Sequence, residues 1–137
     1  MKALIDTNIL LDYLAEREPF IKEAREIIAL CHTEKLCGCV TAHSIADCFF
    51  ILRKIPLDKR REMIIAVIEI MELINIDRSQ MLKALRDENF TDIEDSVQAA
   101  CAEENGLDCV ITRNVKDFKG GSVPAITPAD LLEKINT

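Results

Sequence analysis

Residues 2–15 decide the fold, and their sequence is Lys2-Ala3-Leu4-Ile5-Asp6-Thr7-Asn8-Ile9-Leu10-Leu11-Asp12-Tyr13-Leu14-Ala15. Residues 2–5, apolar from Ala3 to Ile5, predict a short buried strand, because a strand covered on both faces shows no polar alternation. The apolar residues from Ile9 to Ala15 predict a helix only a few positions later. Asp6 therefore lies at the junction of a strand and a helix, at the strand's carboxyl end.

The rest of the chain continues this alternation of strand and helix. Further strands are expected at residues 36–40, 73–76, 108–112 and 123–126. Helices are expected near residues 19–31, 41–55, 58–71, 79–87 and 91–105, and a last one from residue 128. Such alternation predicts a parallel sheet. We therefore expect one α/β domain, residues 1–137, with about five parallel strands and helices on both faces.

Composition is that of a globular protein. The chain has 137 residues, of which 49% are hydrophobic and 30% charged, and this excludes a disordered chain. No apolar run approaches the roughly 20 residues of a membrane span, so no membrane association is expected. Asp6 comes too early for the apolar region of a signal peptide, and a cytoplasmic location is expected.

The six cysteines allow two interpretations. A chain with so large a core needs no disulfide scaffold, and Cys48 and Cys101 lie in apolar helical patterns, where a thiol packs as a small hydrophobe. Four further metal-ligating side chains lie close together in sequence: Cys31, His32, Cys37 and Cys39. Their spacing lacks the C-x2-C unit of common zinc sites. A reduced cysteine cluster in the core is therefore favoured, with a metal site as the alternative.

The net charge of −7 is concentrated in residues 87–108. This segment has eight acidic side chains and no Lys or Arg: Asp87, Glu88, Asp92, Glu94, Asp95, Glu103, Glu104 and Asp108. A solvated acidic face explains it, and so does a cation site, because clustered carboxylates repel one another without a positive charge. The opposite charge gathers in a basic segment that is either a phosphate-contacting patch or a solvated helix surface: Arg53, Lys54, Lys59, Arg60 and Arg61.

Acidic and amide side chains follow three of the predicted strands. Asp6 follows the first strand, Asp47 lies in the segment after the second, and Asn114 and Asp117 follow the fourth. Each one alone has a structural explanation as a helix cap, a helix-dipole partner or a turn residue. Because ligands of open parallel sheets bind beyond the carboxyl ends of the strands, the four together predict a binding site at that edge.

Two further aspartates begin the helix expected at residues 91–105. Asp92 and Asp95 are three positions apart, so they lie on one helix face within reach of a shared ion. Thr91 and Glu94 have the spacing of a capping box, which explains Glu94 but does not require the two aspartates. The aspartates therefore add to the carboxylates expected at the strand ends.

Carboxylate and amide oxygens are hard ligands that suit Mg²⁺ or Mn²⁺, ions that also bind phosphate oxygens. Such ions activate water and neutralise charge in phosphodiester hydrolysis. Histidine-based catalysis has little support, because the chain contains only His32 and His43 and no Ser-His-Asp or Cys-His order. His43 is expected to pack in the core or at the surface.

Four segments together resemble the PIN-domain family, in particular its VapC-toxin type. They are Leu4-Ile5-Asp6-Thr7-Asn8-Ile9-Leu10-Leu11-Asp12, Thr41-Ala42-His43-Ser44-Ile45-Ala46-Asp47, Asp92-Ile93-Glu94-Asp95-Ser96-Val97-Gln98-Ala99-Ala100 and Ile111-Thr112-Arg113-Asn114-Val115-Lys116-Asp117-Phe118. The resemblance covers nearly the whole chain. It implies a metal-dependent endoribonuclease that cleaves single-stranded RNA, with an acidic pocket on a parallel sheet. It also implies the toxin of a toxin–antitoxin pair, an antitoxin protein as partner and a homodimer.

The resemblance also implies roles for individual residues. The expected catalytic residues and ligands of a Mg²⁺ or Mn²⁺ ion are Asp6, Asp47, Asp95 and Asp117. The expected auxiliary residues are Asp92, Asn114, Thr7, Asn8 and Thr112. Asp47 stands where many relatives have Glu, and Asn114 where many have Asp, so the fourth ligand is divided between Asn114 and Asp117, of which we expect Asp117. Asp12 is expected on a helix surface.

Two other functions are alternatives. A PIN fold without turnover would be a binding module. Phosphoryl transfer to Asp6, as in haloacid-dehalogenase-like phosphatases or receiver domains, is less favoured because Asn8 breaks the phosphatases' D-x-D pair and receivers need two acids at the first strand. For the antitoxin, a basic side chain is expected to enter the acidic pocket. An apolar groove between the early helices is expected to hold its amphipathic segment, with the candidates Leu10, Leu14, Ile45 and Phe49.

Overall fold

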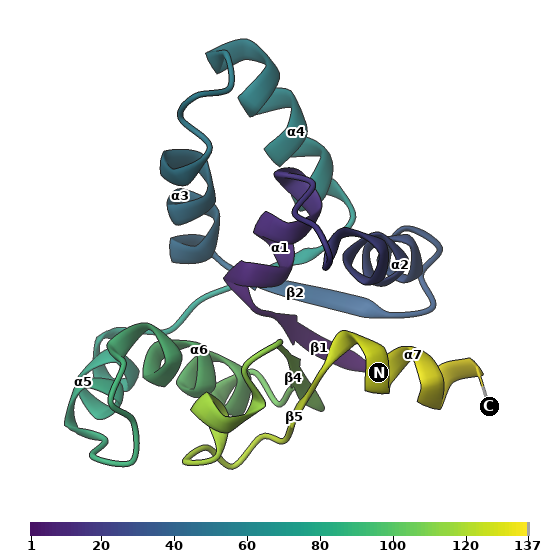
Figure 1. Cartoon of the computed structure of the whole chain (residues 1–137). Coiled ribbons are helices and arrows are strands. Elements are labelled where there is room, and N and C mark those ends of the chain that lie inside the picture. The colour runs from purple at the N-terminus through teal and green to yellow at the C-terminus, as the bar shows by residue number, and fades with distance from the viewer. Residues whose placement is uncertain (137) are drawn as a thin grey trace.

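The computed structural model describes residues 1–136. Within them, five strands form one parallel sheet in the order β3-β2-β1-β4-β5 (Figure 1). The strands are β1 (Lys2–Ile5), β2 (Cys37–Thr41), β3 (Glu72–Ile74), β4 (Cys109–Ile111) and β5 (Ala125–Ile126). The predicted α/β fold with about five parallel strands is confirmed.

Helices cover both faces of this sheet, as predicted (Figure 1). One layer shares an apolar cluster and consists of α1 (Thr7–Leu14), α2 (Ile21–His32), α3 (Ala42–Ile51), α4 (Leu57–Glu69) and α7 (Pro128–Asn136). The other shares a second cluster and consists of α5 (Arg78–Arg86), α6 (Ile93–Glu104) and the 3-10 helix η1 (Val115–Phe118). In β1, Ala3 and Ile5 face the first cluster and Leu4 the second. Residues 3–5 of this central strand are all apolar because both of its faces are covered there.

The strand order reverses at β1, because β2 pairs with one side of β1 and β4 with the other. In an open parallel sheet such a reversal opens a crevice beyond the carboxyl ends of the strands. Ile5 and Ile111 are partners in register at the ends of β1 and β4. The next residues along the chain, Asp6 and Thr112, are therefore placed at the base of this crevice.

The expected elements all occur, with shifted ends. The helix expected at residues 58–71 is Leu57–Glu69, and the second helix begins at Ile21 rather than near residue 19. The strand expected at residues 123–126 is only Ala125–Ile126. Pro124 has no N–H to contribute to the sheet, and its carbonyl alone pairs, accepting from the backbone N–H of Val110 at 2.9 Å. None of the helices within residues 1–136 has the length and hydropathy needed to cross a membrane.

Candidate active site

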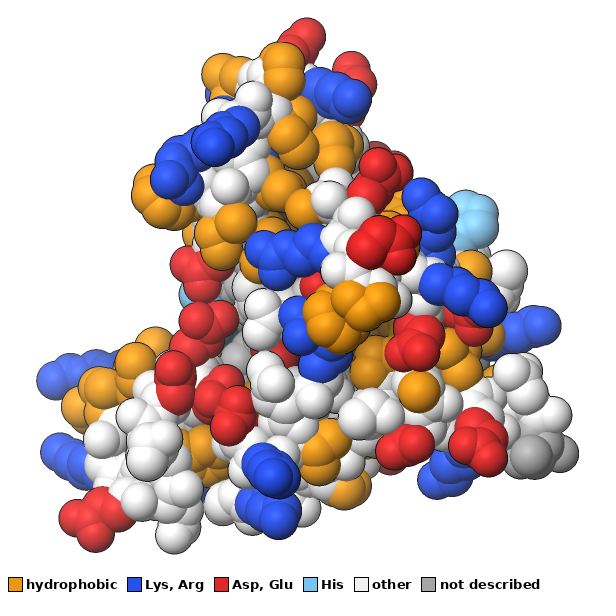
Figure 2. All heavy atoms as spheres, in the orientation of Figure 1, with side chains coloured by type: hydrophobic (Ala, Val, Ile, Leu, Met, Phe, Trp, Pro, Cys, Tyr) orange, Lys and Arg blue, Asp and Glu red, His pale blue; other side chains and the backbone are white. Residues whose placement is uncertain are grey.

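An acidic pocket of about 270 Å³ opens at the carboxyl edge of the sheet. Its walls come from the residues after β1, from α1, α3 and α6, and from the segment around η1. They are formed by Asp6, Thr7, Asn8, Leu11, Asp47, Ile51, Asp92, Glu94, Asp95, Asn114 and Asp117. Figure 2 shows acidic side chains gathered between the part of the molecule that contains α3 and α4 and the part that contains α5 and α6. No Lys or Arg of the described chain lines this pocket.

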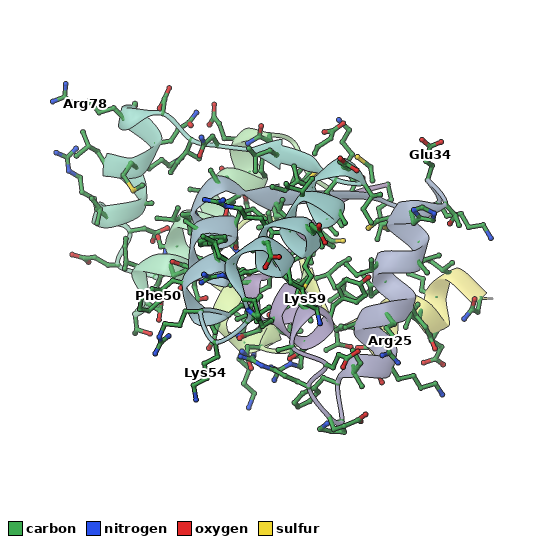
Figure 3. All side chains as sticks on the ribbon, turned by 90° about the horizontal axis from the view of Figure 1, so that it is seen from above. Arg25, Glu34, Phe50, Lys54, Lys59 and Arg78 are labelled. Carbon is green, nitrogen blue, oxygen red and sulfur yellow. The ribbon has the colours of Figure 1, made fainter. Side chains whose placement is uncertain are left out.

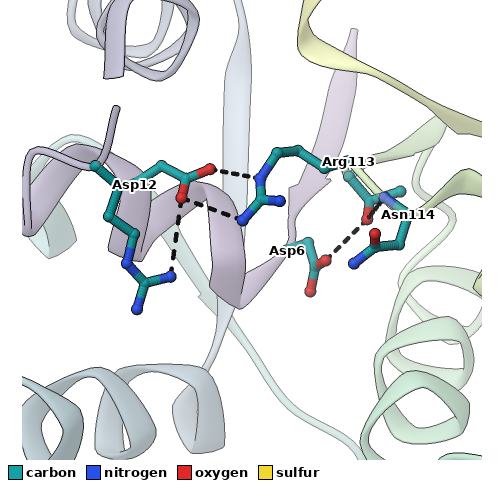
Figure 4. A network of polar contacts seen from close by, with 6 residues as sticks. Asp6, Asp12, Arg113 and Asn114 are labelled. Carbon is teal, nitrogen blue, oxygen red and sulfur yellow. Dashed lines mark hydrogen bonds and ion pairs between the residues drawn. The ribbon is translucent and has the colours of Figure 1, made fainter. Parts of the chain in front are cut away.

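Asp6 is held at the base of the pocket by the end of the neighbouring strand. Its side chain is 5% exposed, and its Oδ2 accepts a hydrogen bond from the hydroxyl of Thr112 at 2.8 Å (Figure 4). Its backbone N–H donates to the carbonyl of Ile111 at 3.0 Å, which continues the ladder between β1 and β4. Burial raises the pKa of Asp6, and hydrogen bonds from Thr112 and Gln98 oppose that rise. The carboxylate is therefore fixed in position and short of positive partners.

Asp92 is the N-cap of α6, and the predicted capping box is wrong in its details. The Oδ1 of Asp92 accepts hydrogen bonds from the backbone N–H groups of Glu94 at 2.8 Å and Asp95 at 3.3 Å. Thr91 lies one residue before the cap, so its side chain does not begin the helix. Asp92 still lines the pocket while it caps the helix.

Asp95 has an unfavourable charge environment. It lies in the first turn of α6, half-buried, with its side chain lining the pocket. Its pKa is raised to about 7, mainly by burial and further by the charges of four carboxylates: Asp92, Asp117, Asp6 and Glu94. Repulsion of this kind disappears when a cation joins the carboxylates. The pocket therefore has the electrostatic character of a cation site.

The remaining expected residues are less buried. Asp47 is half-buried on α3, and Asn114 and Asp117 are exposed at the start of η1 and within it. The backbone N–H of Asn114 donates to the hydroxyl oxygen of Thr112 at 3.0 Å, and Thr112 in turn donates to Asp6. Thr112 thus connects the segment after β4 to the base of the pocket. All four carboxylates expected as ligands line one pocket.

A buried polar network beneath the pocket was not predicted. The Thr7 hydroxyl is hydrogen-bonded to that of Ser44 and donates to Glu94 Oε1 at 3.1 Å. Gln98 Nε2 donates to Ser44 Oγ at 3.4 Å, and its Oε1 accepts from the Thr41 hydroxyl at 3.0 Å. These bonds connect α1, the start of α3 and α6. Glu94 and Gln98 are four residues apart, so they lie on one helix face. This spacing is the one feature of the sequence that indicates the network.

The prediction that Asp12 lies on a helix surface is wrong. Its side chain is 1% exposed and accepts hydrogen bonds from Arg113 Nε at 2.7 Å and Nη2 at 3.3 Å (Figure 4). Arg17 lies 3.8 Å from the same carboxylate, and the guanidinium of Arg113 stacks 3.8 Å from the ring centre of Phe20. The ion pair between Asp12 and Arg113 joins α1 to the segment after β4 that carries Asn114. It therefore fixes one wall of the pocket.

The basic residues expected to contact phosphate lie outside the acidic pocket. Arg53 and Lys54 are exposed in the loop between α3 and α4, and the guanidinium of Arg53 lies 4.6 Å from the ring centre of Phe50. Seen from above, Phe50 and Lys54 lie on the same side of the molecule (Figure 3). Ile51, one residue beyond Phe50, lines the acidic pocket. This loop is thus adjacent to the pocket rim.

The other three basic residues are on α4. Arg60 is half-buried: its guanidinium lies 4.3 Å from the ring centre of Phe49 and donates to the Phe49 carbonyl at 3.0 Å. Arg60 therefore packs α4 onto α3. Lys59 and Arg61 are exposed, and Lys59 lines a different cleft, between α4 and the helices α1 and α2 (Figure 3).

The chain belongs to the PIN domain family, whose model matches residues 2–116. It is 26% identical to the ribonuclease VapC1 of Aquifex aeolicus over 140 residues, which cover 99% of this chain and 96% of the relative. A chain of a toxin–antitoxin complex from Klebsiella pneumoniae superposes with a TM-score of 0.69 at 28% identity, covering 92% of this chain and 97% of that one. The predicted resemblance to the PIN family is therefore confirmed.

More distant structures share the fold. A chain of the VapBC-1 structure from nontypeable Haemophilus influenzae has a TM-score of 0.70 at 18% identity, over 94% of this chain and 99% of that one. At this level of identity the similarity concerns the fold alone.

Proposed function

We propose that the protein is a divalent-metal-dependent endoribonuclease that cleaves single-stranded RNA and is the toxin of a toxin–antitoxin pair. The observation that carries this proposal is the pocket in which Asp6, Asp47, Asp95 and Asp117 converge with no basic residue among its lining side chains, as far as the chain is described. Membership of the PIN family and similarity to a ribonuclease support the same activity. Similarity to a chain of a toxin–antitoxin complex supports the same role.

The donor set of the pocket fits Mg²⁺ or Mn²⁺. Its polar lining atoms are carboxylate, amide and hydroxyl oxygens, with no thiol or imidazole among them, and hard cations prefer such ligands. The raised pKa of Asp95 supports the same assignment, because the carboxylates repel one another without a cation. When bound, such an ion supplies an activated water and neutralises the charge that develops on the phosphodiester.

Each expected site residue has a separate role in this proposal. Asp6 and Asp95 hold the ion from the strand end and from the helix start. Asp47 approaches from α3 with a shorter reach than Glu. Asp117 completes the set, and the auxiliary residues orient ligands and water: Asp92, Asn114, Thr7, Asn8 and Thr112. Thr112 donates a hydrogen bond to one oxygen of Asp6 and thereby orients the carboxylate toward the ion.

The RNA backbone is proposed to follow the exposed basic residues on the rim. Arg53 and Lys54 are suited to phosphate contact because they are exposed in a loop adjacent to the pocket. Lys59 and Arg61 extend the charge along α4. Arg60 contributes mainly through packing, because its guanidinium is engaged with Phe49.

An antitoxin partner is proposed to occupy the large cleft on the α1, α2 and α4 side. This cleft has a volume of about 1,080 Å³ and an apolar lining that includes Tyr13, Leu14, Ile28, Ile55, Met63 and Val67. Of the four expected groove residues, Leu14 lines this cleft and Leu10 is fully buried, while Ile45 and Phe49 are half-buried on α3 and do not line it. A basic side chain of the partner is proposed to enter the acidic pocket and pair with its carboxylates.

A homodimer, a single domain and a cytoplasmic location complete the proposal. Apolar side chains exposed on α5 and at the start of α6 support a self-association surface: Met81, Leu82, Leu85 and Ile93. Residues 1–137 are proposed to form one domain, because Leu131 of α7 belongs to the same core cluster as α1 and α2. The cysteines of the described chain are all free, which supports a reducing compartment.

Cleavage of a labelled single-stranded RNA by the purified protein, with EDTA or with added Mn²⁺, tests the proposal. The ribonuclease is expected to shorten the RNA only in Mn²⁺ or Mg²⁺. A binding module would bind RNA without shortening it under either condition. Phosphoryl transfer would instead label the protein when a small phosphodonor is added, and that label would disappear in Asp6→Asn.

A further inference from the structure

A second cluster of metal-ligating side chains lies at the amino edge of the sheet, away from the acidic pocket. Cys37 and Cys39 are on β2, and Glu72 is the first residue of β3. The two Sγ atoms and a carboxylate oxygen of Glu72 lie within 4.8 Å of one another. Cys39 and Glu72 are partners in register, so the sheet itself brings these side chains together. The acidic pocket lies beyond the other end of the same strands.

The strand determines which cysteines take part. Residues two apart on a strand point to the same face, so Cys37 and Cys39 lie together while Gly38 faces the opposite side. A Cβ at Gly38 would lie 2.6 Å from the Sγ of Cys31, so Cys31 packs on that opposite face. The group Cys31, His32, Cys37 and Cys39 is therefore not brought together. Glu72 lies next to Cys37 and Cys39 instead. It is too distant from them in sequence for a spacing pattern to reveal the cluster.

We propose that Cys37, Cys39 and Glu72 form a Zn²⁺ site. Two thiolates and one carboxylate are three of the four ligands of a tetrahedral zinc ion, and a water molecule completes the coordination. Thiolates select soft cations over Mg²⁺ and Mn²⁺, so this site and the acidic pocket take different ions. Cys37 is half-buried and Glu72 is exposed, so two of the three ligands are accessible to an ion from solvent, while Cys39 is buried.

Lys2 supplies the positive charge of this cluster in the metal-free protein. Its Nζ lies 3.4 Å from Glu72 Oε2, and Lys2 is in register with Cys37 on the neighbouring strand. Zinc binding transfers Glu72 from the Lys2 ammonium to the ion. The two thiols each release a proton to solvent as their sulfur atoms become ligands. Lys2 is therefore a competitor of the metal, and its removal should strengthen binding.

Zinc titration of the full chain under reducing conditions tests this site. A chromogenic chelator reports the affinity, and excess Mg²⁺ keeps the acidic pocket occupied. One equivalent of Zn²⁺ is expected to bind, and Cd²⁺ as a probe is expected to give thiolate-to-metal charge-transfer absorbance. Cys37→Ser should weaken binding by more than the roughly 10–100-fold that loss of an outer-shell partner costs. Lys2→Met should bind Zn²⁺ more tightly than the unaltered chain.

Cys31→Ser is the matched control, because it removes a neighbouring thiol from the other face of the strand. Its zinc affinity and charge-transfer band are expected to equal those of the unaltered chain. Cys39 is completely buried, so Cys39→Ser can fail to fold. In that case Cys37→Ser tests the zinc site, because Cys37 is only half-buried and its replacement perturbs the core less. Binding that survives Cys37→Ser, binding lost equally in Cys31→Ser, or absence of binding in the unaltered chain overturns the site.

Discussion

Replacing Asp95 by Asn in the metal-free protein is expected to raise the free energy of unfolding at about pH 8, and to raise it less at about pH 5. The pKa of Asp95 rises from 3.8 in its unperturbed state to about 7 in the fold. The folded state therefore keeps a proton that the unfolded state has lost. The stability contributed by this group is fully present below the unfolded pKa and is lost as the pH rises through the folded pKa.

The magnitude follows from the size of the shift. A shift of about 3 units corresponds to about 4 kcal/mol at about 1.4 kcal/mol per unit, as an upper limit. Asp95 is only half-buried, and screening by water lowers this to about 1–2 kcal/mol. The amide introduced by Asp95→Asn cannot ionise. The free energy of unfolding of this variant should therefore exceed that of the unaltered protein by about 1–2 kcal/mol at about pH 8, and by less than about half of that at about pH 5.

Urea unfolding in EDTA at the two pH values measures the effect. Glu26→Gln is the matched control, because Glu26 is an exposed acid on α2, and its effect should stay within about 0.5 kcal/mol at both values. Saturating Mn²⁺ should reverse the order of stability, because only the unaltered protein gains about 2.7 kcal/mol at a hundred times its Kd. A stability difference that is the same at both pH values, or a less stable Asp95→Asn at about pH 8, would show that Asp95 is not destabilised by its ionisation in the pocket.

Two further perturbations test other parts of the site. Asp12→Asn should lower the free energy of unfolding by about 3 kcal/mol in urea melts. The reason is that the guanidinium of Arg113, which is only 26% exposed, loses its charged partner. A loss below about 1 kcal/mol would contradict a stabilising buried ion pair. Replacing Arg53, Lys54 and Arg61 together with Gln should weaken RNA binding and flatten its dependence on salt, and an unchanged salt slope in filter-binding assays would show that they are only a solvated surface.

The strand-helix order was predictable because it rests on local signals. The apolar run at residues 3–5, directly followed by Asp6, indicates both a buried strand and the position of a carboxylate at its end. The convergence of the acids on one edge follows from the parallel sheet rather than from any single residue. For the same reason the predicted lining residues of the pocket lie together, although their spacing in sequence is large.

Contacts between distant residues were not predictable. Asp12 pairs with Arg113, 101 positions away, and no pattern around Asp12 distinguishes a buried acid from an exposed one. The hydrogen bond from Thr7 to Glu94 spans 87 positions. The choice of Asp92 over Thr91 as the cap is a competition between adjacent residues that both suit the position. These features depend on how α1, α6 and the segment after β4 pack together.

The most direct test of the central claim, that the converging aspartates hold the ion that cleaves RNA, is single-turnover cleavage of a labelled single-stranded RNA across a Mn²⁺ series. The unaltered chain, Asp95→Asn and Glu26→Gln are compared, with Mn²⁺ binding measured on the same samples. The unaltered chain and Glu26→Gln are expected to cleave only with metal, and Asp95→Asn to lose at least about 100-fold in rate together with Mn²⁺ affinity. Equal cleavage by Asp95→Asn, or cleavage in EDTA, would show that the acidic pocket does not hold a metal ion needed for cleavage.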